Sequence, residues 1–194
     1  MNHELSHALI SLAQHDQQVL AELVAHGELP SAEYHPQMQS VHEANASALR
    51  QVIDEHGWPG EQLVGAEAAD AAWLIAQHAV SDVAFMSLCA ENLRTAVNSG
   101  DAPGWQLAFL EDRIRILTGR NQFYGTQFDI ADDGTVTPLP IENPDTVDDR
   151  RARLGLNTVA ERSAEISRRR ASPTAPRQRN QPMPSGENPS GAVR

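Results

Sequence analysis

The sequence predicts a mainly α fold, an irregular helical bundle of about five helices with one β-hairpin and two short C-terminal helices. Two observations support this prediction. Apolar residues recur at intervals of three and four positions in five segments before Gly119, and four of these segments are followed by a glycine. Between Gln122 and Ile141, apolar and polar residues then alternate around an Asp-Asp-Gly turn, as is typical of a hairpin.

Two long amphipathic helices are expected first. The first covers residues 2–26, and Gly27 is its C-terminal stop. Ser31 is the predicted N-cap of the second helix, which is expected to run from about His35 to Glu55. It must end there because the next residues, His-Gly-Trp-Pro-Gly, break helices.

Three more helices complete the predicted bundle. An alanine-rich helix is expected over residues 66–80, and Ser81 and Asp82 are expected to cap the next one, which stops at Gly100. Pro103 suits the first position of the fifth helix, because a proline there removes only an N–H that the helix would not use.

The C-terminal part is expected to hold two short helices followed by a disordered tail. A short helix is predicted over residues 144–156, and Thr158 is expected to cap a last one that ends at three consecutive arginines. The domain prediction is an N-terminal amphipathic helix over 1–30, a single helical domain over 31–165 with its hairpin at about 122–141, and a disordered tail over 171–194. The tail holds five prolines, no aromatic residue and one branched aliphatic residue, too little apolar surface to offset the entropy of ordering.

Charge is divided unevenly along the chain, which carries a formal net charge of -11. Residues 1–149 hold 23 acidic residues and 5 arginines, whereas residues 150–194 hold 3 acidic residues and 10 arginines. Because the acidic part repels polyanions, no nucleic-acid partner is expected. The absence of lysine excludes Schiff-base and P-loop lysine chemistry, and a single cysteine excludes an intrachain disulfide.

No segment of the sequence points to a membrane. No apolar run approaches the length of a membrane-spanning helix. No basic residue precedes the first apolar positions, as it would in a secretory signal. We therefore expect a cytoplasmic protein without membrane contact.

Four short strings stand in a fixed order along the chain: Gly-Trp-Pro-Gly at 57–60, Ala-Trp-Leu-Ile-Ala-Gln-His-Ala at 72–79, Leu-Glu-Asp-Arg at 110–113 and Tyr-Gly-Thr-Gln at 124–127. Their order and spacing resemble a bacterial family known as domain of unknown function 6624. The resemblance covers residues 40–162 and leaves the first helix and the tail outside. This family has no established activity, so the resemblance implies candidate residues and no reaction.

Two catalytic candidates lie in these strings. His78 is predicted to act as an acid or base, with Asp82 four residues later as its orienting partner, although the same spacing would also suit two metal ligands. The alternative is a helix-end histidine bonded to a turn or to the start of the chain. Asp112 is predicted to be a partner of His78, a second base or a substrate anchor, and the alternative is an intramolecular ion pair that holds its helix to the hairpin. Arg113 is the predicted anchor for a substrate anion.

Uncharged polar residues at the start of the hairpin are the predicted substrate-binding set. Their donors and acceptors suit an amide, a sugar or a base better than proton transfer, and the alternative is a polar ladder between strands. This set comprises Gln122, Tyr124, Thr126 and Gln127. Trp58 is added as a ligand contact, with packing in a rigid turn as its alternative.

No metal site is predicted. Residues 3–7 read His-Glu-Leu-Ser-His, which matches the zinc-protease pattern. We interpret the match as chance, because it lies at the extreme N-terminus with neither a preceding strand nor a third ligand nearby. The sequence leaves the cofactor and the oligomeric state open.

Two hypotheses of function remain from the sequence. In the first, the protein is a hydrolase or transferase that acts on a small polar substrate through the His, Asp, Arg, Tyr and Gln candidates. In the second, it is a non-catalytic helical module that binds or regulates a protein partner. A shared polar pocket would favour the first hypothesis, and an exposed apolar patch would favour the second.

Overall fold

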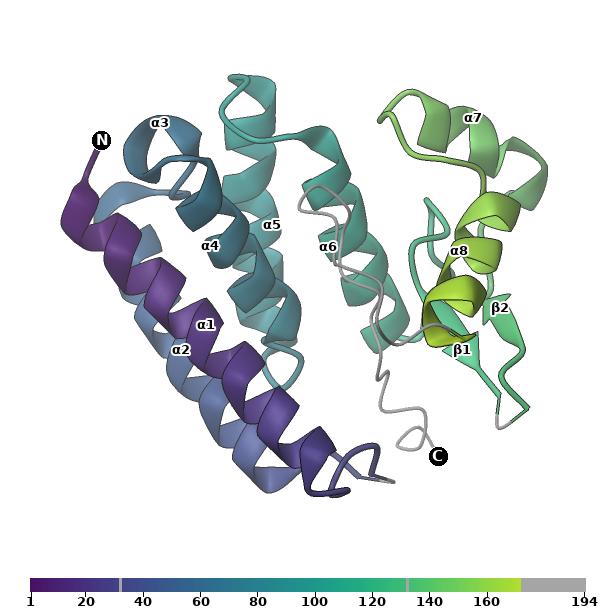
Figure 1. Cartoon of the computed structure of the whole chain (residues 1–194). Helices are drawn as coiled ribbons and strands as arrows, with labels where there is room; N and C mark the ends of the chain where they lie inside the picture. Colours follow the sequence, from purple (N-terminus) through teal and green to yellow (C-terminus); the bar gives the residue numbers. More distant parts are fainter. Residues whose placement is uncertain (32, 132, 172–194) are drawn as a thin grey trace.

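Helices make up most of the chain in the computed structural model, which describes residues 1–31, 33–131 and 133–171 (Figure 1). The α-helices are α1 (His3–Ala25), α2 (Pro36–His56), α3 (Glu61–Val64), α4 (Ala66–His78), α5 (Val83–Asn98), α6 (Gly104–Leu117), α7 (Val147–Ala152) and α8 (Val159–Ala171). A 3-10 turn, η1 (Pro144–Thr146), precedes α7. The predicted mainly α fold with one hairpin is confirmed. The predicted tail over 171–194 lies outside the described residues from 172 onward.

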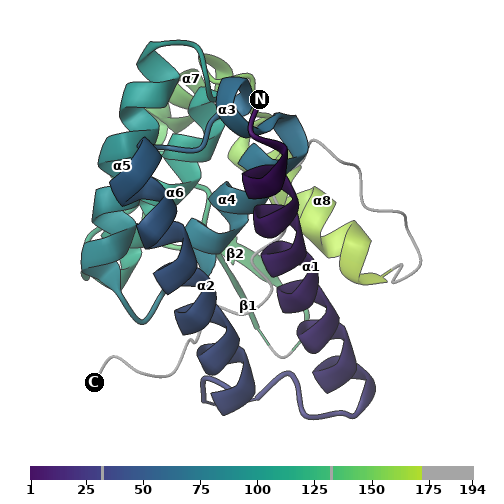
Figure 2. The ribbon, with the colours of Figure 1, turned by 90° about the vertical axis from the view of Figure 1, so that its left-hand side faces the viewer.

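Helix α4 is the centre of the bundle and contacts α1, α2, α3, α5 and α6. Figure 2 shows α1 and α2 side by side, with α4 behind and between them. Ala68, Ala72 and Ala76 follow one another at four-residue spacing on α4, and all three are fully buried. Their small side chains let neighbouring helices approach closely, which explains why an alanine-rich segment occupies the core.

This tight packing leads to a prediction for the core. The substitution Ala72→Leu places a larger side chain at a buried position. It should lower the free energy of unfolding by about 1–3 kcal/mol, because the added carbons have no space between the helices. Urea unfolding followed by circular dichroism measures the change. Ala44→Leu on the exposed face of α2 is the control and should stay within about 0.5 kcal/mol of the wild type. Equal effects of the two substitutions would contradict the prediction.

The observed helix starts differ from the sequence prediction at two places. Ser31 is not the N-cap of α2: its hydroxyl donates to the backbone oxygen of Glu33, and the side chain of His35 caps the helix instead. Pro36 explains the shift, since its fixed φ suits the first helical position. Pro103 is the N-cap of α6 rather than its first residue, and the short helix α3 was not predicted.

The predicted caps of two other helices are confirmed. Asp82 accepts a hydrogen bond from the backbone N–H of Phe85 at the start of α5. Thr158 and Glu161 bond reciprocally at the start of α8, which makes a capping box.

The hairpin is shorter than the predicted range. Strand β1 (Phe128–Ile130) pairs antiparallel with β2 (Val136–Pro138), and Phe128 lies opposite Pro138. Gln122 and Ile141 make only an isolated bridge, and it is parallel. The chain bends at Gly125, where φ is +66° and a Cβ atom would lie 2.9 Å from Val159. The turn residue Asp132 lies outside the described residues.

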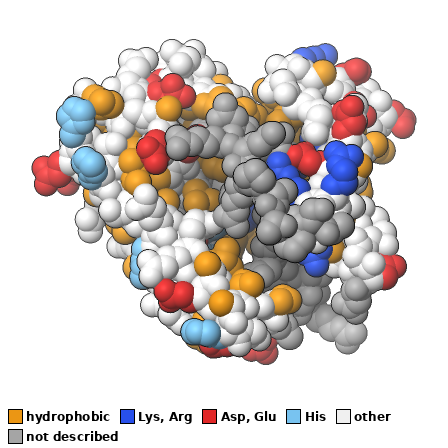
Figure 3. Space-filling model, viewed as in Figure 1, with side chains coloured by type: hydrophobic (Ala, Val, Ile, Leu, Met, Phe, Trp, Pro, Cys, Tyr) orange, Lys and Arg blue, Asp and Glu red, His pale blue; other side chains and the backbone are white. Residues whose placement is uncertain are grey.

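The C-terminal elements form a separate layer beside the bundle. Helix α8 packs on β2, and α7 and α8 lie on the far side of α6 from α4 (Figure 1). In the view of Figure 3, arginine side chains gather on the side of these C-terminal helices. None of the helices in the described ranges is both long and apolar enough to cross a bilayer.

A buried carboxylate between two histidines

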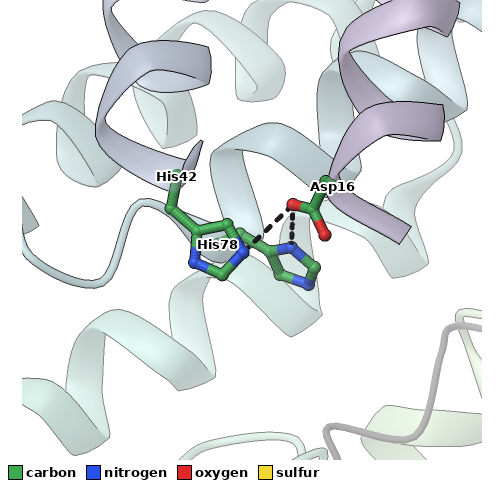
Figure 4. A group of neighbouring side chains, drawn as sticks. All are labelled: Asp16, His42 and His78. Carbon is green, nitrogen blue, oxygen red and sulfur yellow. Dashed lines mark hydrogen bonds and ion pairs between the residues drawn. The ribbon is translucent and has the colours of Figure 1, made fainter. Parts of the chain in front are cut away.

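Asp16, in the middle of α1, is the centre of a buried polar cluster (Figure 4). The residue is 1% exposed. Its Oδ2 atom accepts a hydrogen bond from Nδ1 of His78 at 2.7 Å and lies 3.1 Å from Nε2 of His42. The three side chains come from α1, α2 and the last residue of α4, so the cluster exists only where these helices meet.

Tyr34 extends the cluster from the loop before α2. Its hydroxyl makes a short hydrogen bond with Nδ1 of His42. Burial, together with the charges of Asp16 and Glu43, raises the pKa of Tyr34, so the hydroxyl keeps its hydrogen and donates it. Tyr34 thus fixes the orientation of the His42 ring.

The pKa directions assign charge within the cluster. Burial by itself would raise the pKa of Asp16, but contacts with His42 and His78 outweigh it, and the pKa falls well below its usual range. Burial, together with His42 and Arg113, lowers the pKa of His78 by more than Asp16 raises it. Asp16 is therefore ionised and His78 neutral at neutral pH.

These charges settle the tautomer of His78. Because Asp16 accepts from Nδ1, that nitrogen carries the hydrogen, and Nε2 keeps a free lone pair. Figure 4 shows this second nitrogen pointing away from Asp16. A neutral imidazole held in this way suits proton transfer from a bound water or hydroxyl group.

A cavity of about 190 Å³ lies beside the cluster. It is lined by His42, Glu43, Ala46, Ser47, Arg50, His78, Ala79, Ser81 and Asp82. Asp82, predicted as a possible partner of His78, instead pairs with Arg50 at 2.9 Å. Both histidines face this small polar space while Asp16 lies behind them.

The structure brings Arg113 close to His78. The guanidinium Nη1 of Arg113 donates to the backbone oxygen of Gln77 at 3.0 Å, and its charge lowers the pKa of His78. Burial lowers the pKa of Arg113 to about 10, which still leaves it positively charged at neutral pH.

Asp112 is fully buried and lies in another network. Its carboxylate accepts hydrogen bonds from the backbone N–H groups of Phe123, Tyr124 and Thr126 and from the Thr126 hydroxyl. In the part of the chain that the structure describes, no hydrogen bond joins Asp112 to His78. These contacts join α6 to the start of the hairpin through hydrogen bonds, whereas the predicted alternative was an ion pair; the catalytic role of Asp112 stays a prediction.

The other hairpin candidates belong to the same network. The side chain of Gln122 bonds to the backbone N–H and oxygen of Gln127 and to the oxygen of Leu139. Nη1 of Arg151 donates to the backbone oxygens of Tyr124 and Gly125.

Thr126, Gln127 and Trp58, the remaining residues predicted to contact the substrate, are all buried. Nε2 of Gln127 donates to the hydroxyl of Thr126. Trp58 is 7% exposed and packs in the main core, as its alternative interpretation expected. Nothing in these contacts tests the substrate-binding roles of the hairpin set or of Trp58, which stay predictions.

The sequence analysis did not identify Asp16, His42 and Tyr34 as site residues. One signal for Asp16 was present. It occupies a buried position on the apolar stripe of α1, between Ala13 and Val19. A carboxylate there needs a partner. His42 belongs to a His-x-x-Asn string at 42–45 that also resembles the family, but its partners lie on other elements, so local spacing did not indicate a role for it.

Fold and site together define a mainly helical protein with a carboxylate–histidine cluster at a small polar pocket. A family described as of unknown function, DUF6624, matches residues 3–167, and the chain belongs to it. The match corrects the predicted range of 40–162, because it includes α1 and therefore Asp16. No curated protein and no solved structure matches the chain.

Proposed function

We propose that this protein is a hydrolase or transferase that acts on a small polar substrate in the cavity beside His42 and His78. One observation carries the proposal: the buried carboxylate of Asp16 is hydrogen-bonded to Nδ1 of His78, and His78 lines a cavity. A carboxylate and an imidazole arranged in this way recur in enzymes that activate water or a hydroxyl group.

His78 is the proposed general base. Its Nε2 accepts the proton of a water molecule or of a substrate hydroxyl, which then attacks the substrate. Asp16 keeps Nδ1 protonated and stabilises the imidazolium that forms. Removal of such a base costs about 10²–10⁴-fold in rate.

The cavity also supports the choice of substrate class. Its volume of about 190 Å³ restricts the substrate to a small molecule or a small group of a larger one. Ser47 and Ser81 offer hydroxyl groups, and Arg50 offers a guanidinium held by Asp82. Arg113 does not line this cavity; in this proposal its charge lowers the pKa of His78, and its role as an anchor for a substrate anion stays a prediction.

A panel of small chromogenic substrates tests the proposal, with one ester, one phosphate monoester and one amide. The substitution His78→Gln should lower kcat/KM by at least about 100-fold, which corresponds to about 2.7 kcal/mol. The control, His56→Gln, removes an exposed histidine at the end of α2 that is not in the cavity and should leave kcat/KM unchanged. Equal activity of His78→Gln and the wild type would refute the role of His78.

A further inference from the structure

The same three side chains form a ligand set for a metal ion. Asp16, His42 and His78 each offer one ligand atom, and these atoms all lie within 4.8 Å of one another. Two imidazoles and one carboxylate on one side of an ion are a recurring set for divalent iron, and zinc and cobalt also accept these ligand types. Open positions remain on the other side for water or substrate.

The distances in the cluster suit a bound ion. Ligand atoms at about 2.1 Å from an octahedral ion lie about 3.0 Å apart when they are neighbours, and somewhat farther apart around a tetrahedral ion. Oδ2 of Asp16 lies 2.7 Å from Nδ1 of His78 and 3.1 Å from Nε2 of His42. Both distances to Asp16 therefore suit neighbouring ligands of one ion, and the two histidine nitrogens lie within 4.8 Å of each other.

A buried nitrogen supports this interpretation. Nε2 of His42 has no correctly angled hydrogen-bond partner among the described residues, although Asp16 is close to it. A buried nitrogen without such a bond is costly, and coordination of an ion would satisfy it. Contact with Tyr34 then orients the His42 ring from its other side, as outer partners of metal-bound histidines do.

We propose that Asp16, His42 and His78 bind one divalent transition-metal ion, with zinc as the expected metal. Each neutral imidazole binds through the nitrogen that faces Asp16 and carries its hydrogen on the other nitrogen. The Nδ1–H of His42 then donates to the oxygen of Tyr34. The charges of Asp16 and Glu43, which both act on Tyr34, offset the nearby charge of Arg113.

The proposal of metal binding depends only on this geometry. The proposal that the metal takes part in a reaction rests on the proposed function. With an ion bound, His78 would be a ligand rather than a general base, and the ion would activate the attacking water in its place. The reaction class, hydrolysis or group transfer, stays the same.

The test uses the full chain, freed of metal with EDTA and titrated with cobalt(II) chloride and, separately, with zinc chloride. Calorimetry should find one zinc ion per chain, and the cobalt form should show visible absorption bands of an ion bound by nitrogen and oxygen. Asp16→Asn and His42→Gln should each weaken zinc binding by about 100-fold, and the milder Tyr34→Phe by about 10-fold. Circular dichroism checks that each variant is folded.

A double variant, His3→Gln with His7→Gln, is the matched control, because these exposed histidines lie one turn apart on α1. It should bind zinc as the wild type does. No zinc binding by the wild type, or binding lost only in this control, would overturn the metal proposal. Turnover of the substrate panel that persists in EDTA would overturn the metal's role in the reaction while leaving the proposed function intact. Zinc binding without turnover of any substrate in the panel would contradict the proposed function while leaving the metal-binding proposal intact.

Discussion

Asp112→Ala is expected to lower the free energy of unfolding by about 3–5 kcal/mol. The substitution leaves three backbone N–H groups, the buried one of Thr126 and the partly buried ones of Phe123 and Tyr124, without their acceptor. Each unsatisfied buried donor costs about 1–3 kcal/mol, and the lost carboxylate also leaves a small cavity. Urea unfolding followed by circular dichroism and by tryptophan fluorescence measures the change.

A neighbouring acidic residue supplies the control for Asp112. Glu111 precedes it on α6, and its carboxylate pairs with Arg94 at 2.7 Å near the surface. Such a pair contributes about 0–1 kcal/mol, so Glu111→Ala should cost no more than that. If Asp112→Ala unfolds as easily as Glu111→Ala, Asp112 does not anchor the hairpin, and its predicted catalytic role regains support.

Arg151→Met should cost about 2–4 kcal/mol. Arg151 is 1% exposed, and its guanidinium donates to the backbone oxygens of Tyr124, Gly125 and Asn157. Methionine keeps much of the apolar stem but offers no donor, so these carbonyls lose their partner. The same unfolding measurement applies, with scanning calorimetry as an independent check.

Arg151 and its control differ in how far their side chains are exposed. Arg153, two residues later on the same short segment, is exposed, and Arg153→Met should change the free energy of unfolding by less than about 0.5 kcal/mol. A stability of Arg151→Met close to that of Arg153→Met would show that the backbone oxygens find other donors. In that case α7 would not be held to the hairpin through Arg151.

Together, Asp112 and Arg151 hold the 123–126 segment from two sides, one through its N–H groups and the other through its carbonyls. This explains why the Leu-Glu-Asp-Arg and Tyr-Gly-Thr-Gln strings lie side by side. Arg113 from the first string, in contrast, reaches the backbone of Gln77 beside His78. Adjacent residues of one motif therefore contact different networks, because successive residues on a helix point about 100° apart.

Most of the secondary structure could be predicted because its signals are local. The apolar spacing of α1, the cap at Asp82 and the capping box at Thr158 each involve residues a few positions apart. The cap of α2 was wrong because Ser31 and His35 are both able to cap, and the proline at position 36 decides between them. The hairpin was predicted too long, since alternation cannot reveal where paired hydrogen bonds stop.

By itself, the sequence determined the mainly α fold, the order of the helices and His78 as a candidate base. Only the tertiary structure decided the partner of His78. Asp16 lies 62 residues before it, and no spacing rule connects two positions on different helices. The packing of α1 and α2 against the end of α4 sets that contact and adds His42. Burial then makes the three polar groups depend on one another, since each would be costly alone in the interior.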